Sequence, residues 1–136
     1  MEQIRRELMN RMGDVLKAIR LFKSSPGQHA MGTLAALDRT RATSVTQLAT
    51  QCALDPSTVS RAVTALVKDG LVERTADPAD GRAGVLSISP HGREVLEATI
   101  RTYDARLAHA LRDWSADDLR TLTALLKRFS EDLETL

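Results

Sequence analysis

Apolar side chains recur at helical spacing along most of this chain of 136 residues. Residues 4–19 carry one apolar face at the spacing of a helix, and a Ser-Ser-Pro-Gly stretch ends it. A second helix is expected to begin near Pro26, and Ser44 is placed to cap a short third helix. The pair Asp55-Pro56 predicts the start of a fourth, because Asp is a favoured N-cap and Pro is tolerated at the first helical position.

The second half of the chain returns to helical spacing after a short β-type interruption. Gly70 ends the fourth helix, and two short strands are expected at residues 71–75 and 85–88, with a turn rich in Asp, Pro, Gly and Arg between them. Ser89-Pro90 then predicts a long fifth helix, and Ser115 begins a last one with a capping box. This order predicts a mainly α protein with a small β-wing, an α+β fold of the winged helix-turn-helix type.

Composition is ordinary for one soluble globular domain over residues 1–136, with 43% hydrophobic and 27% charged residues. No apolar run approaches the roughly 20 residues that cross a membrane, and the N-terminus leads into no apolar signal core. A cytoplasmic location without a membrane partner is therefore expected. The net charge is only +1, so a nucleic-acid partner must be argued from the local placement of basic side chains.

No cofactor, metal site or catalytic site is predicted. Cys52 is the single cysteine, which excludes an intrachain disulfide, and the histidines at positions 29, 91 and 109 show no metal-ligand spacing. The chain offers no nucleophile–base pair and no phosphate-binding loop, and its polar residues are spread over outer helix faces. These absences argue against an enzyme.

The helix expected after Asp55 has an outer face suited to the DNA major groove. Its apolar stripe consists of Val59, Ala62, Val63, Leu66 and Val67. On the other side, small hydroxyl side chains can bond phosphates or base edges, and an arginine can bind guanine through two hydrogen bonds. The candidate major-groove residues are Ser57, Thr58, Ser60, Arg61 and Thr64. A solvated amphipathic helix would show the same pattern, so this face alone does not identify a DNA reader.

The turn between the two expected strands adds basic side chains beside that helix. Arg74 precedes the turn and Arg82 lies at its far side, and an arginine on a protruding hairpin can enter a narrow minor groove, where the potential is most negative. Asp77 and Asp80 would repel phosphates if they faced DNA, so Asp80 is expected to orient a neighbouring arginine. An ordinary acidic hairpin turn is the alternative interpretation.

Taken in order, the short motifs of this chain are more specific than any one of them. The chain resembles the MarR family of winged-helix regulators in the identity and spacing of Gln47-Leu48-Ala49, Asp55-Pro56-Ser57-Thr58-Val59-Ser60-Arg61, Leu66, Gly70-Leu71-Val72, Arg74, Asp77-Pro78, Asp80, Arg82, Ser89 and Gly92. The resemblance extends over almost the whole chain, flanking helices included.

The resemblance implies a role for each candidate residue. In that family the fold is a homodimer whose first, fifth and sixth helices form the interface, the fourth helix enters the major groove and a wing arginine enters the minor groove. The implied contacts are therefore Ser57, Thr58, Ser60, Arg61 and Thr64 in the major groove, and Arg82 in the minor groove, with Arg74 at the base of the wing and Asp80 as the supporting carboxylate. Ala79 and Gly81 stand where the family's wing often carries basic residues, which implies weaker affinity or salt dependence.

The terminal helices carry more apolar surface than a small domain can bury. Their stripes lie at opposite ends of the chain, so the same surface on a second copy is the simplest cover, as in a two-fold symmetric dimer. Residues 1–24 and 90–136 are thus expected to form a helical dimerisation region, and residues 26–89 a DNA-binding lobe. A dimer also supplies a second DNA half-site. An intramolecular bundle is the alternative.

Many members of the family bind small aromatic or phenolic molecules between the dimerisation helices and the DNA-binding lobe, which releases DNA. The resemblance implies an effector pocket lined by Ile19, Phe22 and His29 with residues of the fifth helix. His29 stands where the family usually has an aromatic residue, and it can bond a ligand, titrate near neutral pH, or lie at the surface as a cap. Another branch senses peroxides through a cysteine of the first helix, whereas Cys52 falls on the third helix beside its apolar stripe, which favours a buried hydrophobic role.

The sequence therefore predicts a dimeric, sequence-specific DNA-binding transcriptional regulator, a repressor of a pseudo-palindromic operator that a small aromatic ligand releases. The alternative is a winged-helix module that binds protein without specific DNA binding. The near-neutral net charge and the thinly basic wing keep that alternative open. Salt-sensitive binding to duplex DNA separates the two hypotheses.

Overall fold

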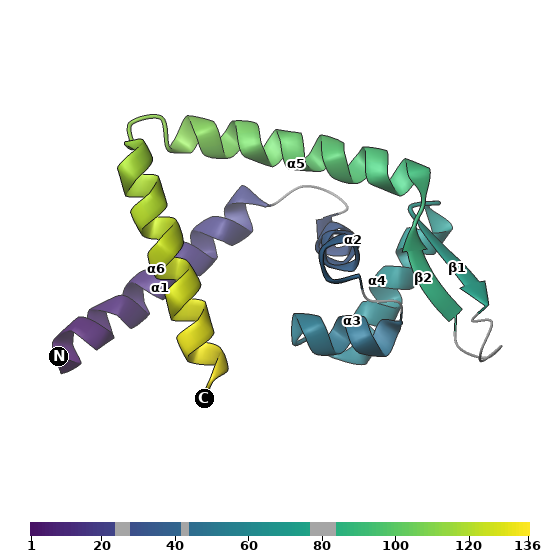
Figure 1. The fold of residues 1–136 in the computed structure, drawn as a ribbon, viewed down its shortest axis with the longest axis horizontal. Coiled ribbons are helices and arrows are strands. Elements are labelled where there is room, and N and C mark those ends of the chain that lie inside the picture. Colours follow the sequence, from purple (N-terminus) through teal and green to yellow (C-terminus); the bar gives the residue numbers. More distant parts are fainter. Residues whose placement is uncertain (24–27, 42–43, 77–83) are drawn as a thin grey trace. The chain divides into compact units, whose positions relative to one another are not determined.

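The computed structural model describes residues 1–23, 28–41, 44–76 and 84–136, apart from the side chains of residues 28 and 29. In chain order the elements are α1 (Glu2–Phe22), α2 (Gln28–Thr40), α3 (Val45–Cys52), α4 (Pro56–Lys68), β1 (Val72–Ala76), β2 (Gly84–Ile88), α5 (Pro90–Ala110) and α6 (Ala116–Glu134) (Figure 1). The chain divides into two units, residues 1–100 and 101–136, and the division falls within α5. The helical architecture with its small antiparallel sheet confirms the predicted fold class.

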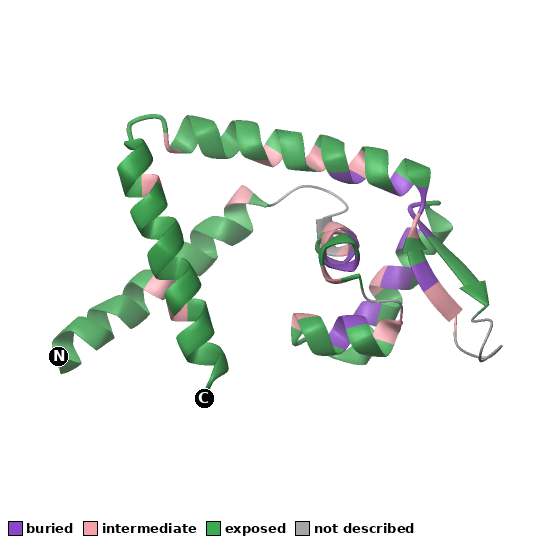
Figure 2. Ribbon diagram, viewed as in Figure 1, coloured by how far each residue is buried: buried purple, intermediate pink, exposed green. Residues whose placement is uncertain are grey.

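The core of the first unit is formed by α2, α3, α4, the sheet and the first turns of α5, where the buried residues gather in Figure 2. Its apolar members are Leu34, Ala36, Leu37, Leu48, Ala49, Val59, Val63, Leu66, Leu71, Val72, Leu86 and Leu96. Full burial of a leucine or valine side chain contributes roughly 1.5–3 kcal/mol to folding. Val67 departs from the stripe predicted for α4, because it is 38% exposed at the edge of the packed face. The core therefore holds one side of α4 and leaves the other to solvent.

The two strands form an antiparallel hairpin whose register places Val72 opposite Ile88 and Arg74 opposite Leu86. Residues directly opposite each other share a face of the sheet, and alternate residues of one strand do so too. Arg74 thus shares its face with the buried Val72 and Leu86, and the Arg74–Leu86 pair lies in the middle of the hairpin. Compared with the predicted ranges, β1 is shifted by one residue toward the turn and β2 begins one residue earlier, since pairing continues slightly further toward the turn than composition indicates.

The end of α4 is closed by the glycine that the sequence singled out. Gly70 has φ +74°, in the left-handed region that favours glycine, and its N–H donates to the carbonyl of Val67 at 3.1 Å. The N–H of Leu71 donates to the carbonyl of Leu66 at 2.9 Å, and both of these leucines are buried. This is a Schellman motif with its accompanying apolar contact, and it turns the chain from α4 directly into β1.

The first turn of α5 is joined to that corner by Ser89. Its buried hydroxyl donates to the carbonyl of Gly70 at 2.5 Å and accepts the N–H of Gly92 at 2.9 Å, while its own N–H donates to the carbonyl of Leu71 at 3.0 Å. Ser89 is therefore both the N-cap of α5 and the link to the end of α4, which confirms the predicted cap and gives it a second use.

Ser89→Ala is expected to lower the free energy of unfolding by about 1–2 kcal/mol, because it leaves the buried Gly92 N–H and the Gly70 carbonyl without the hydroxyl. The measurement is urea unfolding followed by circular dichroism, at one protein concentration for all variants. Ser130→Ala is the matched control, since the Ser130 hydroxyl donates to the Lys127 carbonyl at an exposed site on α6. Equal losses in the two variants would mean that the Ser89 link does not stabilise the fold.

The terminal helices α1 and α6 bury none of their residues within the chain. On α1 the exposed apolar side chains include Ile4, Leu8, Met9, Val15, Leu16, Ile19 and Leu21, and on α6 they include Leu122, Leu125, Leu126 and Leu133. Exposed apolar surface of this extent is typical of an interaction face. The start of α6 matches its prediction, because the Ser115 hydroxyl and the Asp118 carboxylate each accept the other's backbone N–H.

Candidate nucleic-acid interface

The outer face of α4 is the candidate DNA-reading surface. Because Val59, Val63 and Leu66 pack into the core, the opposite side of the helix is turned outward. All of the residues predicted for the major groove are exposed on α4, namely Ser57, Thr58, Ser60, Arg61 and Thr64. Ser57 and Thr58 lie in the first turn of α4, where unpaired N–H groups and the helix dipole favour a phosphate, whereas Thr64 lies past the middle of the helix.

Hydrogen bonds within α4 divide these hydroxyl groups into two kinds. The Ser57 hydroxyl donates to the Asp55 carboxylate, and the Thr64 hydroxyl donates to the carbonyl of Ser60 at 2.9 Å. Both oxygens can then act on DNA only as acceptors. The side chains of Thr58, Ser60 and Arg61 form no hydrogen bond or ion pair with a described residue, and these donors are of the kind that bind phosphates or base edges.

Asp55 occupies the predicted N-cap position of α4, but its carboxylate bonds the Ser57 hydroxyl and makes no cap bond to the backbone. The physical reason is competition between two nearby donors, a hydroxyl and a backbone N–H, for the same short side chain. The exposed carboxylate is thereby held at the end of the helix.

A tight connection fixes α4 against α3. The Ser44 hydroxyl accepts the N–H of Gln47 at 3.1 Å, which confirms the predicted cap of α3. After α3, Ala53 adopts φ +51°, and the N–H of Leu54 donates to the carbonyl of Ala49 at 3.0 Å. This left-handed residue reverses the chain so that α4 begins almost at once, as a helix-turn-helix requires.

On the wing, Arg74 is the predicted contact that the structure describes. A Cβ added to Gly84 would lie 2.7 Å from Cγ of Arg74 and 2.9 Å from its Cδ, so the arginine stem lies directly over this glycine. Gly84 thus leaves room for the stem along the hairpin, toward the end where β2 begins. Asp80 and Arg82, which the sequence assigns to the wing tip, lie outside the described residues, so their roles stay predictions.

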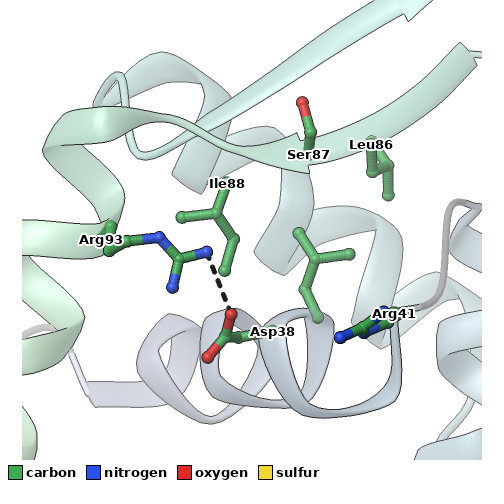
Figure 3. Close-up of a pocket in the computed structure, with 7 residues that line it drawn as sticks. Asp38, Arg41, Leu86, Ser87, Ile88 and Arg93 are labelled. Atoms are coloured by element: carbon green, nitrogen blue, oxygen red, sulfur yellow. Dashed lines mark hydrogen bonds and ion pairs between the residues drawn. The ribbon is translucent and has the colours of Figure 1, made fainter.

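The residues predicted to line an effector pocket are only partly described. Ile19 is 43% exposed and Phe22 is half-buried near the end of α1. His29 lies in the first turn of α2, and its side chain is outside the described part. The structure contains a shallow cavity of about 520 Å³ elsewhere, lined by Leu37, Asp38, Arg41, Leu86, Ser87, Ile88 and Arg93 (Figure 3). Among the described residues that line this cavity, Arg93 belongs to α5, and neither Ile19 nor Phe22 is present.

Two of the residues that line this cavity form an ion pair, which sequence reasoning did not find. Nη2 of Arg93, in the first turn of α5, lies 3.1 Å from Oδ1 of Asp38, near the end of α2. The two residues are 55 positions apart, and no motif or periodicity connects them. The sequence does carry one local signal. Asp38 is an acidic residue near the C-terminal end of a helix and Arg93 is a basic residue near the N-terminal end of another, and the helix dipole disfavours both placements.

The remaining sequence predictions concern metal, membrane and thiol chemistry. Cys52 is half-buried and packs against the core, as expected of a small apolar side chain. Within the described ranges, no group of His, Cys, Asp and Glu has the arrangement of a metal site. Of the helices that the structure describes, none combines the length and the apolar composition needed to cross a bilayer.

Comparison with known families and proteins places this geometry in context. The model of the MarR family matches residues 26–83, which include α2, α3, α4 and β1. A curated relative, the uncharacterized HTH-type transcriptional regulator YxaD of Bacillus subtilis (strain 168), is 33% identical over 87 residues. The match covers 64% of this chain, and it spans about three fifths (61%) of that relative's length.

Solved structures extend the similarity to the terminal helices. A probable transcriptional regulator from Pseudomonas aeruginosa is 31% identical, with a TM-score of 0.66 over 90% of this chain and 93% of that one. The crystal structure of MarR has a TM-score of 0.75 over 94% of this chain and 91% of that one, and at 22% identity it shows the shared fold. The structural similarity therefore extends beyond residues 26–83, and it includes the helices on both sides of that segment.

Proposed function

Because this chain belongs to the MarR family of winged-helix transcriptional regulators, we propose that it is a sequence-specific repressor that binds a pseudo-palindromic DNA operator as a homodimer. The observation that carries this proposal is the outer face of α4, where Thr58, Ser60 and Arg61 are exposed and no described residue uses their hydrogen-bond donors. Membership of a family of regulators also means that the chain is a regulator and not an enzyme.

In the proposed complex, α4 lies in the major groove. Its hydroxyl side chains are short, so the helix can approach the base edges closely, and Arg61 can bind the two acceptors of a guanine. Ser57 and Thr64 would accept hydrogen bonds from bases, since their own protons are already used. Arg82 of the wing would enter the adjacent minor groove, with the Asp80 carboxylate holding it in place. Arg74, at the base of the wing, would contact a phosphate of the DNA backbone. The proposal keeps the cytoplasmic location that the sequence predicts.

The dimer is supported by the apolar side chains that α1 and α6 expose. Exposure of a hydrophobic helix face to water is unfavourable. A self-complementary contact between two copies would cover the apolar faces of both α1 and α6. The proposed dimerisation region is residues 1–24 and 90–136, with residues 26–89 as the DNA-binding lobe.

At micromolar concentration the protein is expected to sediment as a dimer in analytical ultracentrifugation. Leu125→Glu places a charge in the exposed apolar face of α6, where Leu125 is 58% exposed, and is expected to shift the protein to monomer. Arg120→Glu is the control, because Arg120 lies on the same helix with a side chain that is 75% exposed and paired to Asp117. A wild-type monomer that still binds DNA tightly would contradict the proposed assembly.

The proposal includes a small aromatic or phenolic effector that releases DNA. What supports it is that Ile19 and Phe22 lie one helical turn apart on α1 and both keep accessible apolar surface, which suits contact with an aromatic ring. For the mechanism to work, the effector must bind the DNA-incompetent arrangement more tightly than the competent one.

The second candidate function is a protein-binding module, and the observation that favours it is the net charge of +1. A protein that binds DNA mainly through phosphate contacts loses affinity steeply as the salt concentration rises. A module that docks on protein is not expected to bind duplex DNA at either salt concentration. Binding to duplex DNA at two salt concentrations therefore separates the candidates.

A further inference from the structure

The first turn of α5 is held to the rest of its unit at two points. At the first, Ser89 and Gly92 lie against the end of α4, where a Cβ on Gly92 would meet the Leu71 carbonyl oxygen at 2.0 Å. At the second, Arg93 reaches α2 through the ion pair with Asp38 at 3.1 Å (Figure 3). Two points on one helical turn define both where α5 begins and the direction in which it leaves.

The two points differ in how easily they can be altered. Ser89 and Gly92 are buried, and they lie against the backbone of Gly70 and Leu71 at the end of α4, so these contacts cannot be loosened without moving that corner. The ion pair is open to water, with 39% of the Asp38 side chain and 54% of the Arg93 side chain exposed, and it borders the shallow cavity. Such a contact contributes little to global stability, but it restricts rotation about the buried point.

The charges themselves indicate that this pair serves the contact between helices. Asp38 lies in the last turn of α2, where the helix dipole favours a cation, and Arg93 lies in the first turn of α5, where it favours an anion. Each residue therefore opposes the local preference of its own helix. What the arrangement stabilises is the approach of α2 to α5.

We propose that the Asp38–Arg93 ion pair sets the angle between α5 and the α2–α3–α4 lobe, and so fixes the operator half-site spacing that the dimer accepts. The inference rests on the proposed function, because the spacing between the two copies of α4 exists only in a dimer built on the terminal helices. At 1.5 Å per residue α5 is about 30 Å long, so a tilt of about 5° at its first turn displaces the far end by about 2–3 Å. A shift of that size is close to the rise of one base pair. Asp38 and Arg93 are positioning residues, and neither is assigned a DNA contact.

The test uses the full-length protein and duplexes selected from a random pool for binding to the wild type. One base pair is then inserted or deleted between the half-sites, and affinities are measured by fluorescence anisotropy. Asp38→Asn keeps the shape of the side chain and removes its charge. It is expected to lower the discrimination between correct and altered spacing by about threefold to tenfold, since two weak ion pairs are lost per dimer.

The charge-swapped variant carrying Asp38→Arg and Arg93→Asp is expected to restore the spacing preference. It reverses both charges, keeps the pair and agrees with both helix dipoles. The unfolding temperature of all variants should stay within a few degrees of the wild type, because the pair is exposed. Full discrimination in Asp38→Asn, or lost discrimination that the swap does not restore, would overturn the inference.

A second measurement decides the inference without DNA. Spin labels attached through Lys68→Cys, in a Cys52→Ser background, report the distance between the two copies of α4 in the dimer. The distance distribution is expected to broaden in Asp38→Asn and to narrow again in the charge-swapped variant. If the selection returns no DNA, the proposed function fails while this distribution still tests the angle, and an unchanged width overturns the positioning role.

Discussion

Gly92→Ala is expected to lower the free energy of unfolding by about 3–5 kcal/mol, a large effect for a single added methyl group. The added Cβ would lie 2.0 Å from the carbonyl oxygen of Leu71 and 2.9 Å from its carbonyl carbon. Backbone cannot rotate away as a side-chain end can, and the same carbonyl accepts the Ser89 N–H. The first turn of α5 must therefore move off the corner between α4 and β1. Thermal unfolding followed by circular dichroism should show a midpoint about 10 °C or more below that of the wild type.

Gly32→Ala is the matched control for that substitution. Gly32 is exposed on α2, and a Cβ there would meet nothing within 4 Å. Since alanine is a better helix former than glycine, the free energy of unfolding of this variant should equal that of the wild type or exceed it by up to about 1 kcal/mol. A Gly92→Ala protein that unfolds at the wild-type temperature would mean that the close approach of α5 to the Leu71 carbonyl is not a feature of the folded protein.

Arg61→Ala is expected to weaken specific DNA binding by about 1–3 kcal/mol, or roughly fivefold to 150-fold in Kd, and to relax the base preference at one position of each half-site. Arg61 is exposed on the proposed reading face of α4 and forms no ion pair with a described residue, so its removal should leave the fold intact. The measurement is anisotropy on a selected duplex and on duplexes that carry each base change in turn.

Arg120→Ala is the control for charge alone. It removes one positive charge from α6, far along the chain from the reading helix, and should change DNA affinity only slightly. Equal behaviour of Arg61→Ala and the wild type on every duplex would exclude Arg61 from base contact. A uniform loss on all duplexes, with the base preference retained, would assign Arg61 to a phosphate instead.

Helix ends were the most predictable part of this fold, because they depend on a few neighbouring residues. Ser44, Ser89 and Ser115 all cap helices where the sequence places them, and Gly70 takes the left-handed conformation that ends α4. Each signal is a side chain or a missing Cβ acting within four residues, so no tertiary information is needed. The candidate reading face followed in the same way, since the apolar stripe of α4 determines which side is exposed.

What the sequence did not predict depends on contacts between distant elements or on competition between alternatives. The Asp38–Arg93 pair joins α2 to α5 across 55 positions, and its location requires knowing how those helices pack. The Asp55 carboxylate accepts the Ser57 hydroxyl and not a backbone N–H of α4, and the sequence does not show which of these two donors it binds. The glycine at position 92 was noticed as part of a motif, but only the packed corner shows that no Cβ fits there.

The terminal helices mark a different limit of sequence reasoning. Their apolar stripes were visible as periodicity, and the structure confirms that this surface is exposed in the single chain. Burial of such a stripe is a property of the assembly, so one chain shows only that a cover is needed. The proposed dimer would supply that cover.

The most direct test of the central claim is anisotropy of the purified protein on duplex DNA from its own promoter region, at two salt concentrations, with random duplex as competitor. The proposed repressor should bind promoter DNA tightly, and the complex should persist when random duplex is added. Its affinity should fall steeply as the salt concentration rises, because phosphate contacts release counterions. Two results would contradict sequence-specific recognition and favour a protein-docking module. One is binding that random duplex abolishes, and the other is no binding to promoter DNA at low salt together with a selection from random duplexes that returns no DNA.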